Sequence, residues 1–170
     1  MKAAIVPVLI SLAFFLQFCT SKSAIDTETL VRRDDQVIRE YLAEKNIPAQ
    51  KLSTGIYYQN SKQGTGEKPT IGDTVYVHYT GNIIYSYVFD SSRFKDTPFQ
   101  FRVGVGNVIP GWDLSVVNMR VGERGTFFIP SYLGYGISGS PQDRNTGVRS
   151  IPSNSILIFD IELLEIRKQK

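Results

Sequence analysis

From Lys51 to the end of the chain, apolar residues recur at every second position in short runs that are separated by turn residues. In one such run, Val75, Val77 and Tyr79 alternate with polar or half-polar neighbours, and residues 99–103 repeat the pattern. A period of two places all the apolar side chains of a run on one face of an extended strand. The pattern therefore predicts β-strands that each have one buried face.

The last strand is the longest of these runs. Four apolar residues from Leu157 to Leu163 share one face, whereas Asp160 and Glu162 occupy the other, and a shorter strand is expected around residues 126–129. Turn signals rich in glycine separate the runs, as expected for connections within an antiparallel sheet.

One segment breaks the period of two. After Pro110, the residues Trp112, Val116 and Met119 follow one another at helical spacing and would form a stripe on one face of a short helix. We expect this stripe to pack on the inner face of the sheet. The sequence from 51 to 170 thus predicts one α+β domain, a bent antiparallel β-sheet wrapped round one short α-helix.

Composition and charge exclude several functions. The chain has 170 residues, 42% of them hydrophobic, and a formal net charge of +3 that is not concentrated in any basic block, so no nucleic acid partner is expected. It contains one cysteine and one histidine, far apart in sequence, which argues against a zinc site or a cysteine–histidine nucleophile. We expect neither a metal nor a cofactor. His78 is expected on the solvent side of its strand.

The first nineteen residues are typical of an export signal. Lys2 precedes an apolar run from Ala3 to Phe18, which is too short to span a bilayer. Cys19 ends the run and resembles the lipidated cysteine of a bacterial lipoprotein, although Gln17 and Phe18 are larger than usual there. The prediction is a signal peptide at 1–19 and a lipid-anchored protein that faces the periplasm. A cleaved soluble signal and an uncleaved anchor remain alternatives.

Residues 20–50 are expected to form a polar tether followed by a short helix. The tether extends to about Arg33, Asp34 caps the helix, and Asn46 together with Pro48 ends it. The helix either packs on the main domain or serves as a dimerisation helix; we expect the former and a monomeric protein.

Six motifs appear in a fixed order between about residues 53 and 168. They are Val77–Gly81 (VHYTG), Val88–Arg93 (VFDSSR), Pro98–Phe101 (PFQF), Val108–Trp112 (VIPGW), Tyr135–Gly136 (YG) and Ile156–Leu163 (ILIFDIEL). In order and spacing this set strongly resembles the FKBP-type peptidyl-prolyl cis/trans isomerases. The resemblance implies the family fold, a bent antiparallel sheet around a short helix.

The same resemblance implies a binding pocket, with Trp112 as its floor. The implied catalytic residues are Tyr79, Phe89, Asp90 and Tyr135, and the implied substrate-binding residues are Phe99, Val108, Ile109, Trp112, Ile151 and Phe159. The Tyr135 hydroxyl and the Ile109 N–H would donate hydrogen bonds to ligand carbonyls. Asp90 would polarise the site, hold Tyr135 and its loop, or cap its own turn, and a pairing with Lys95 is a further option. The stretch 137–150 is several residues longer than in compact family members.

The expected activity is acceleration of rotation about Xaa-Pro bonds in exported proteins. Proline-containing polypeptides would be the substrates, and macrolides such as rapamycin would compete with them. Each aromatic residue taken alone is more often core than site, so the prediction depends on the whole set. Two alternatives remain: a proline-peptide-binding chaperone or adaptor without turnover, and a purely structural lipoprotein.

Overall fold

The computed structural model describes residues 27–144, 147 and 150–169. The expected signal segment 1–19 and Cys19 lie outside these residues. Among the described helices, none is both long and apolar enough to cross a membrane.

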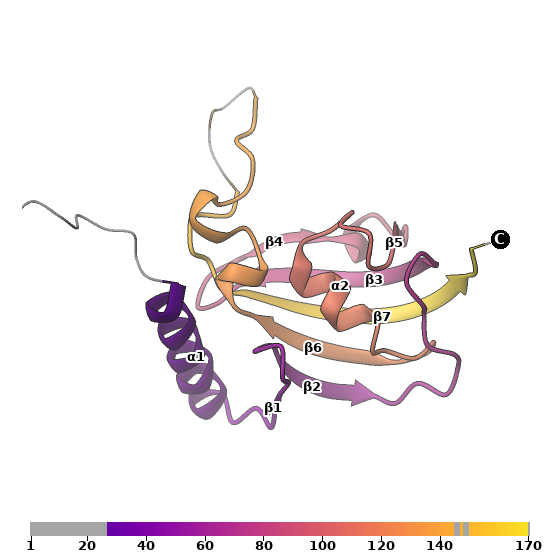
Figure 1. Ribbon diagram of the computed structural model, residues 1–170, viewed down its shortest axis with the longest axis horizontal. Helices are drawn as coiled ribbons and strands as arrows, with labels where there is room; N and C mark the ends of the chain where they lie inside the picture. Colours follow the sequence, from indigo (N-terminus) through magenta and orange to yellow (C-terminus); the bar gives the residue numbers. More distant parts are fainter. Residues whose placement is uncertain (1–26, 145–146, 148–149, 170) are drawn as a thin grey trace, which may run out of the picture.

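A single bent antiparallel sheet forms the body of the molecule (Figure 1). Its strands are β1 (Gln50–Lys51), β2 (Tyr57–Lys62), β3 (Thr74–Ile83), β4 (Val88–Ser91), β5 (Phe99–Arg102), β6 (Arg124–Ile129) and β7 (Leu157–Arg167). They lie in the order β1-β2-β6-β7-β3-β4, and β5 pairs with the first half of β3 while β4 pairs with its second half. The alternation from Lys51 onward is thereby explained, and the predicted α+β architecture is confirmed.

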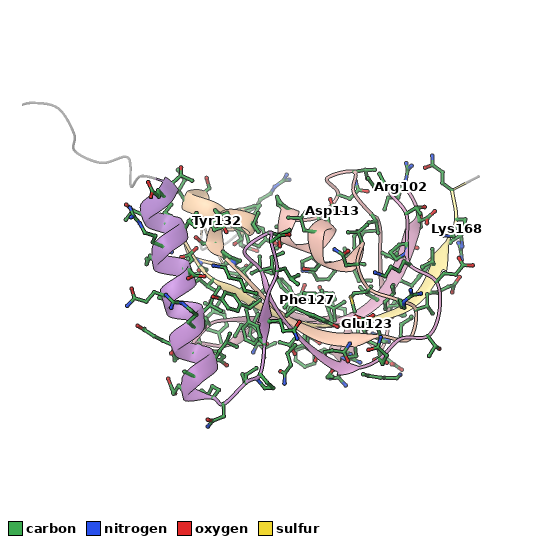
Figure 2. The ribbon with its side chains drawn as sticks, turned by 60° about the horizontal axis from the view of Figure 1, so that its bottom comes forward. Arg102, Asp113, Glu123, Phe127, Tyr132 and Lys168 are labelled. Carbon is green, nitrogen blue, oxygen red and sulfur yellow. The ribbon has the colours of Figure 1, made fainter. Side chains whose placement is uncertain are left out.

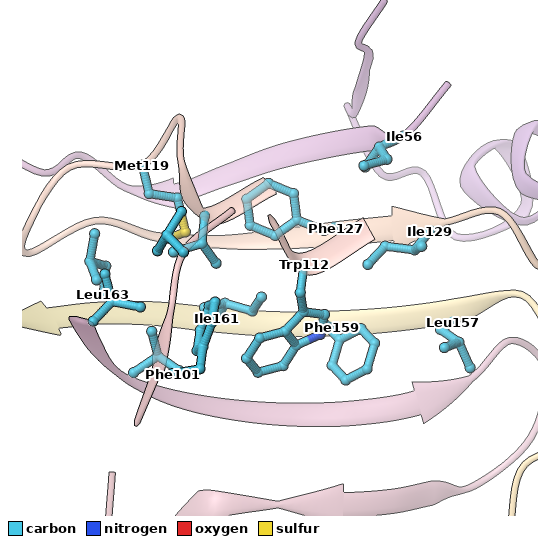
Figure 3. Packing of buried hydrophobic residues seen from close by; sticks show 14 of the residues in the cluster. Ile56, Phe101, Trp112, Met119, Phe127, Ile129, Leu157, Phe159, Ile161 and Leu163 are labelled. Carbon is cyan, nitrogen blue, oxygen red and sulfur yellow. The ribbon is translucent and has the colours of Figure 1, made fainter. Parts of the chain in front are cut away.

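The inner face of the sheet is covered by α2 (Pro110–Val116). Proline at the first helical position has its φ already set for a helix. Gly111 follows because a Cβ there would lie 2.4 Å from Cγ2 of Ile129 on β6. The predicted stripe of Trp112, Val116 and Met119 is buried in the main core. Figure 3 shows Trp112 and Met119 there. The close approach of helix and sheet therefore places the indole deep in the main core.

The outer face of the sheet carries α1 (Thr27–Glu44), which packs across one end of it (Figure 1). Ile38 and Leu42 of α1 contact a second, smaller apolar cluster that includes Tyr57 and Phe128. Tyr57 and Phe128 are direct cross-strand partners and so lie on the same face. The helix packs on its own domain, as predicted.

The predicted start of this helix was wrong. It begins at Thr27 rather than at Asp34, and Asp34 is fully buried within the helix instead of capping it. Part of the predicted tether, residues 27–33, is helical, and its polar residues Glu28 and Arg32 form an i,i+4 ion pair on the exposed face. The predicted end is confirmed: Asn46 takes a left-handed φ of 52°, and the N–H of Ile47 bonds to the Leu42 carbonyl at 2.9 Å.

Three short 3-10 turns complete the described chain: η1 (Ser92–Phe94), η2 (Ser131–Leu133) and η3 (Gly136–Ser138). The first joins β4 to β5, and the other two follow β6 and lead into the long loop before β7.

The end of the sheet far from α1 is held by Asp73, just before β3. Its carboxylate accepts hydrogen bonds from the N–H and hydroxyl of Thr70, from the N–H of Gln169 and from the ammonium group of Lys168. Figure 2 shows Lys168 at this far end, near Arg102. Asp73 therefore fastens the end of β7 to the beginning of β3, the two strands that share the longest ladder.

Candidate functional site

A hollow of about 250 Å³ opens between α2 and the strands beneath it. Ten residues line it: Tyr79, Phe89, Asp90, Phe99, Asn107, Val108, Ile109, Trp112, Tyr135 and Phe159. Since one liquid water molecule takes up about 30 Å³, the hollow can hold a group several times larger. Six of its ten lining residues are aromatic, so flat, apolar groups can pack against its walls.

Trp112 forms the floor of the hollow. Its indole meets Tyr79 at 5.0 Å and Phe159 at 5.1 Å between ring centroids, with the planes nearly perpendicular in both pairs. Edge-to-face contacts of this kind are favoured because the positive edge of one ring meets the negative face of another. Only 4% of Trp112 is exposed, so its neighbours hold the indole in place, and Figure 3 shows Phe159 beside it.

The walls come from strands that run past this floor. β3 contributes Tyr79, β4 contributes Phe89, and β7 contributes Phe159, which meets Phe89 at 5.6 Å and 87°. Gly81 makes the packing of these two rings possible, because a Cβ at this position would lie 2.7 Å from both Phe159 Cε1 and Phe89 Cζ. Gly81 is thus a structural requirement of the wall.

Phe99 lies at the rim rather than inside. It stacks on Phe101 and touches Trp112 edge-to-face at 5.7 Å, yet 39% of its surface is exposed, whereas Phe101 is buried. The alternation along β5 predicted both rings inward. Phe99 is the first residue of β5 and lines the hollow, whereas Phe101 lies further along the strand in the main core.

Polar groups at the edge of the hollow centre on Asp90. Its Oδ2 accepts a hydrogen bond of 2.5 Å from the Tyr79 hydroxyl, and its Oδ1 accepts one of 2.9 Å from the N–H of Ser91. Burial of the hydroxyl and this carboxylate together raise the pKa of Tyr79 well above its usual range. No ion pair joins Asp90 to Lys95 in the part of the chain that the structure describes.

Two residues that line the hollow, Tyr135 and Ile109, each have a hydrogen-bond donor without a partner among the described residues. The Tyr135 hydroxyl has none, and its pKa is raised above the ordinary value of 10.0 by burial first and by the charge of Asp90 second. The N–H of Ile109, just before α2, also lacks an acceptor within the described chain, while the Ile109 carbonyl accepts from Trp112 N–H at 2.9 Å. Both donors are available to the carbonyls of a bound ligand.

The loop before α2 is held in place by the helix itself. Asp113 accepts the N–H groups of Gly104 at 2.8 Å and Gly106 at 3.2 Å, and both glycines have a φ of +74°. Few residues other than glycine adopt this backbone conformation readily. The loop can therefore turn tightly and present Val108 and Ile109 to the hollow.

Of the residues expected in the pocket, the structure brings together all but one. Ile151 is only 2% exposed and belongs to the main core rather than the lining; its N–H and carbonyl bond to Ser140 and so fasten the long loop. Asn107 lines the hollow but was not predicted, since nothing in its local sequence distinguishes it. His78 lies outside the lining, with Nδ1 3.1 Å from the Ser92 hydroxyl.

Comparison with known proteins identifies the family. Residues 65–164 match the FKBP-type peptidyl-prolyl cis-trans isomerases. FK506-binding protein 2 of Dictyostelium discoideum is 43% identical over 119 residues, which cover 70% of this chain and 83% of that protein. The FKBP-type peptidyl-prolyl cis-trans isomerase FkpA of Aeromonas hydrophila is also 43% identical, over 131 residues, but this region is only 45% of its length and 76% of the present chain.

Solved structures agree with this result. The crystal structure of a peptidyl-prolyl cis-trans isomerase from Pseudomonas syringae pv. tomato superposes with a TM-score of 0.67 at 28% identity, covering 84% of this chain and 96% of the other. The matched region contains the whole lining of the hollow. The chain belongs to the FKBP-type peptidyl-prolyl cis-trans isomerase family and is an isomerase of this type.

Proposed function

We propose that the aromatic hollow is the active site and that it accelerates rotation about Xaa-Pro bonds in exported polypeptides. One observation carries this proposal: a space walled by rings and floored by Trp112 has two unused donors, from Tyr135 and Ile109, at its edge. A proline ring is apolar and flat enough to lie on the indole, and the flanking carbonyls of the peptide can accept from the two donors.

The required rate enhancement is moderate. Rotation about the peptide bond crosses a barrier of ~18–20 kcal/mol because amide resonance is lost at the twisted geometry. Uncatalysed exchange takes ~10–100 s, so a turnover of ~10²–10³ per second needs roughly 4–7 kcal/mol of transition-state stabilisation. No bond is made or broken. Neither a nucleophile nor a general base is needed.

The hollow supplies this stabilisation because it favours the twisted geometry of the Xaa-Pro bond over the planar one. The planar amide has a large charge separation that water stabilises, whereas the twisted amide has less, so a dry aromatic environment favours the twisted state. The donors from Tyr135 and Ile109 hold the flanking carbonyls in the bent arrangement that the twist requires. We assign Phe89, Phe99, Val108 and Phe159 to the walls that exclude water.

Asp90 is assigned to positioning the wall. Because its two oxygens are used by the Tyr79 hydroxyl and the Ser91 N–H, the carboxylate fixes the Tyr79 ring and caps its own turn at once. Its charge also disfavours ionisation of Tyr135, which keeps that hydroxyl a donor.

Macrolides such as rapamycin are expected to bind in the same hollow, in competition with proline-containing peptides. The similarity to a relative named for binding FK506 supports this expectation. Trp112 is the only tryptophan in the chain, so its fluorescence reports binding at the floor directly.

For location, we propose an exported protein held at the cell envelope by a lipid on Cys19, with residues 51–170 as the isomerase domain. The apolar run before Cys19 supports this proposal. Labelling with a fatty-acid analogue in the wild type and in Cys19→Ala tests it: label in the wild type alone is expected, and equal labelling would contradict it.

We further propose that the protein acts as a monomer. The apolar face of α1, which includes Leu30, Ile38 and Leu42, is buried against the rest of the chain and is not available to a second copy. Sedimentation of the described domain at micromolar concentration should give the mass of one chain.

The competing function is a binding module without turnover. A protease-coupled assay on a short Xaa-Pro peptide separates the two functions. Turnover that rapamycin abolishes supports the enzyme, whereas tight binding with no change in rate supports a chaperone or adaptor.

A further inference from the structure

We propose that Arg33 and Asp34 of α1 are positioning residues for Tyr135, so that the helix outside the hollow sets the place of a donor inside it. This inference rests on the proposed role of Tyr135 as a donor to substrate.

Tyr135 is carried by the short segment from Ser131 to Gly136, which contributes no other residue to the hollow. The phenol has no hydrogen bond of its own within the described chain. Its hydroxyl is therefore placed by the backbone that carries it rather than by contacts at its tip. Whatever fixes the two ends of this segment also fixes the donor.

The first end is held by Asp34. Its Oδ2 accepts the N–H of Ser131 at 2.7 Å and the Ser131 hydroxyl at 2.6 Å, and both residues are fully buried. Its Oδ1 accepts two hydrogen bonds from the Arg33 guanidinium, at 2.9 and 2.5 Å. A buried carboxylate with all four contacts in place is a rigid anchor, because no solvent competes for it.

The second end is held by Arg33 through one intermediate residue. The same guanidinium nitrogen, Nη2, donates to the carbonyl of Asn154 at 3.1 Å, and the N–H of Asn154 donates to the Gly136 carbonyl at 2.7 Å. Asn154 holds a left-handed φ of 56° to make both contacts with its main chain. One Arg–Asp pair on α1 thus reaches both sides of Tyr135.

The neighbouring residue on α1 provides a matched control. Asp35 is also bound to the body of the protein, through Lys51 at 2.5 Å and the Tyr57 hydroxyl at 2.8 Å. These partners lie on β1 and β2, and among the described residues their side chains make no hydrogen bond to residues 131–136. Loss of Asp35 weakens the docking of α1 without touching the two anchors described above.

The test compares Asp34→Asn, Ser131→Ala and Asp35→Asn in the full chain, at temperatures well below the lowest Tm of the set. Two quantities are measured: kcat/KM, and the NMR signal of Tyr135 ¹³Cζ in protein that carries ¹³C-labelled tyrosine. The Tyr135 signal is identified as the one that disappears in Tyr135→Phe. In Asp34→Asn an amide N–H faces the Arg33 donors, so the anchor is lost and we expect the Tyr135 signal to shift. We expect kcat/KM to fall roughly 10-fold, because about 1 Å of misplacement of a catalytic group can lower the rate by up to ~100-fold. Ser131→Ala keeps the backbone bond and should give a smaller change in the same direction. Asp35→Asn should lower Tm but leave both readouts unchanged.

A double variant tests whether the effect passes through Tyr135. If it does, Asp34→Asn in the Tyr135→Phe background costs nothing further in kcat/KM. Losses that multiply, or a Tyr135 signal that stays at the wild-type position in Asp34→Asn and Ser131→Ala, would overturn the inference. Full activity of Tyr135→Phe alone would instead refute the donor role in the proposed function, while the ¹³C signal would still decide whether Asp34 positions Tyr135.

Discussion

The Tyr79 hydroxyl on β3 donates a hydrogen bond of 2.5 Å to the Asp90 carboxylate on β4, across the edge of the aromatic hollow. The same Tyr79 ring meets Trp112 at 5.0 Å. A polar contact at the rim is thus linked by one side chain to the apolar floor, and the position of the wall depends on both.

Asp90→Asn tests this link. An amide in place of the carboxylate keeps the shape but turns a charge-assisted hydrogen bond into a neutral one, which is about half as strong. We expect kcat/KM to fall about 5-fold, equivalent to about 1 kcal/mol, with little change in Tm because Asp90 is exposed. Steady-state assays and thermal melts check this together, and Lys95→Ala serves as the control. A loss equal to that of Lys95→Ala would show that Asp90 has no role in the site.

Gly81→Ala tests the packing of the wall. The added methyl group would lie 2.7 Å from both Phe89 and Phe159, so one ring must move. We expect a loss of about 1–3 kcal/mol in the free energy of unfolding and weaker rapamycin binding. Denaturant melts and the fluorescence of Trp112 measure the two effects. The variant Gly81→Ala/Phe89→Leu should regain stability, and an identical loss in both would mean that the strain lies elsewhere.

The pH dependence of the activity follows from Tyr135. Its pKa is raised above 10.0 by burial and then by Asp90, so the hydroxyl stays protonated and able to donate up to at least about pH 10. Because the folded protein favours the neutral form of Tyr135, this residue contributes to the stability of the fold fully below its unfolded pKa. That contribution is lost as pH rises through its folded pKa. Exchange measured by NMR on an Xaa-Pro peptide should show a flat kcat/KM from pH 7 to about 10. A decline centred well below pH 10 that Tyr135→Phe removes would contradict this assignment.

Acid sensitivity of the fold follows from Asp73. The N–H and hydroxyl of Thr70 first, and then Gln169 and Lys168, hold the pKa of this carboxylate well below its ordinary value of 3.8. A lowered pKa gives stabilisation that is complete above 3.8 and is lost as pH falls toward the folded pKa. Asp73→Asn should therefore lower Tm at pH 7, and the difference from wild type should shrink below about pH 4. A difference that stays constant down to pH 2 would exclude ionisation as its cause.

Much of the fold could be predicted from the sequence because the period of two on the strands and the helical spacing of Trp112, Val116 and Met119 are properties of single segments. The burial of β6 on both of its faces was harder to predict from the sequence. Phe128 on β6 points away from the main core, and the α1 helix that covers it has only a few apolar residues among many charged ones.

The error in the predicted start of α1 has one physical cause. Asp34 has the chemistry of a helix cap, but its buried carboxylate satisfies Ser131, which is 97 residues further along the chain. Such a long-range polar contact leaves no periodic signal. The same holds for two residues near the site. The family resemblance implies Ile151 in the lining although it is buried in the core, and no local signal predicts Asn107, which does line the hollow.

The proposed function requires the aromatic hollow to lower the barrier to rotation about Xaa-Pro bonds. The most direct measurement is the cis/trans exchange rate of one such peptide in the presence of the full chain, its Phe89→Ala variant, and either protein saturated with rapamycin. We expect the exchange rate to rise in proportion to the amount of wild-type protein, and the catalysed rate to fall at least 10-fold with Phe89→Ala while the Tm changes little. Rapamycin should return the rate to the uncatalysed value. Exchange catalysed equally well by Phe89→Ala, or unaffected by rapamycin, would place the catalysis elsewhere.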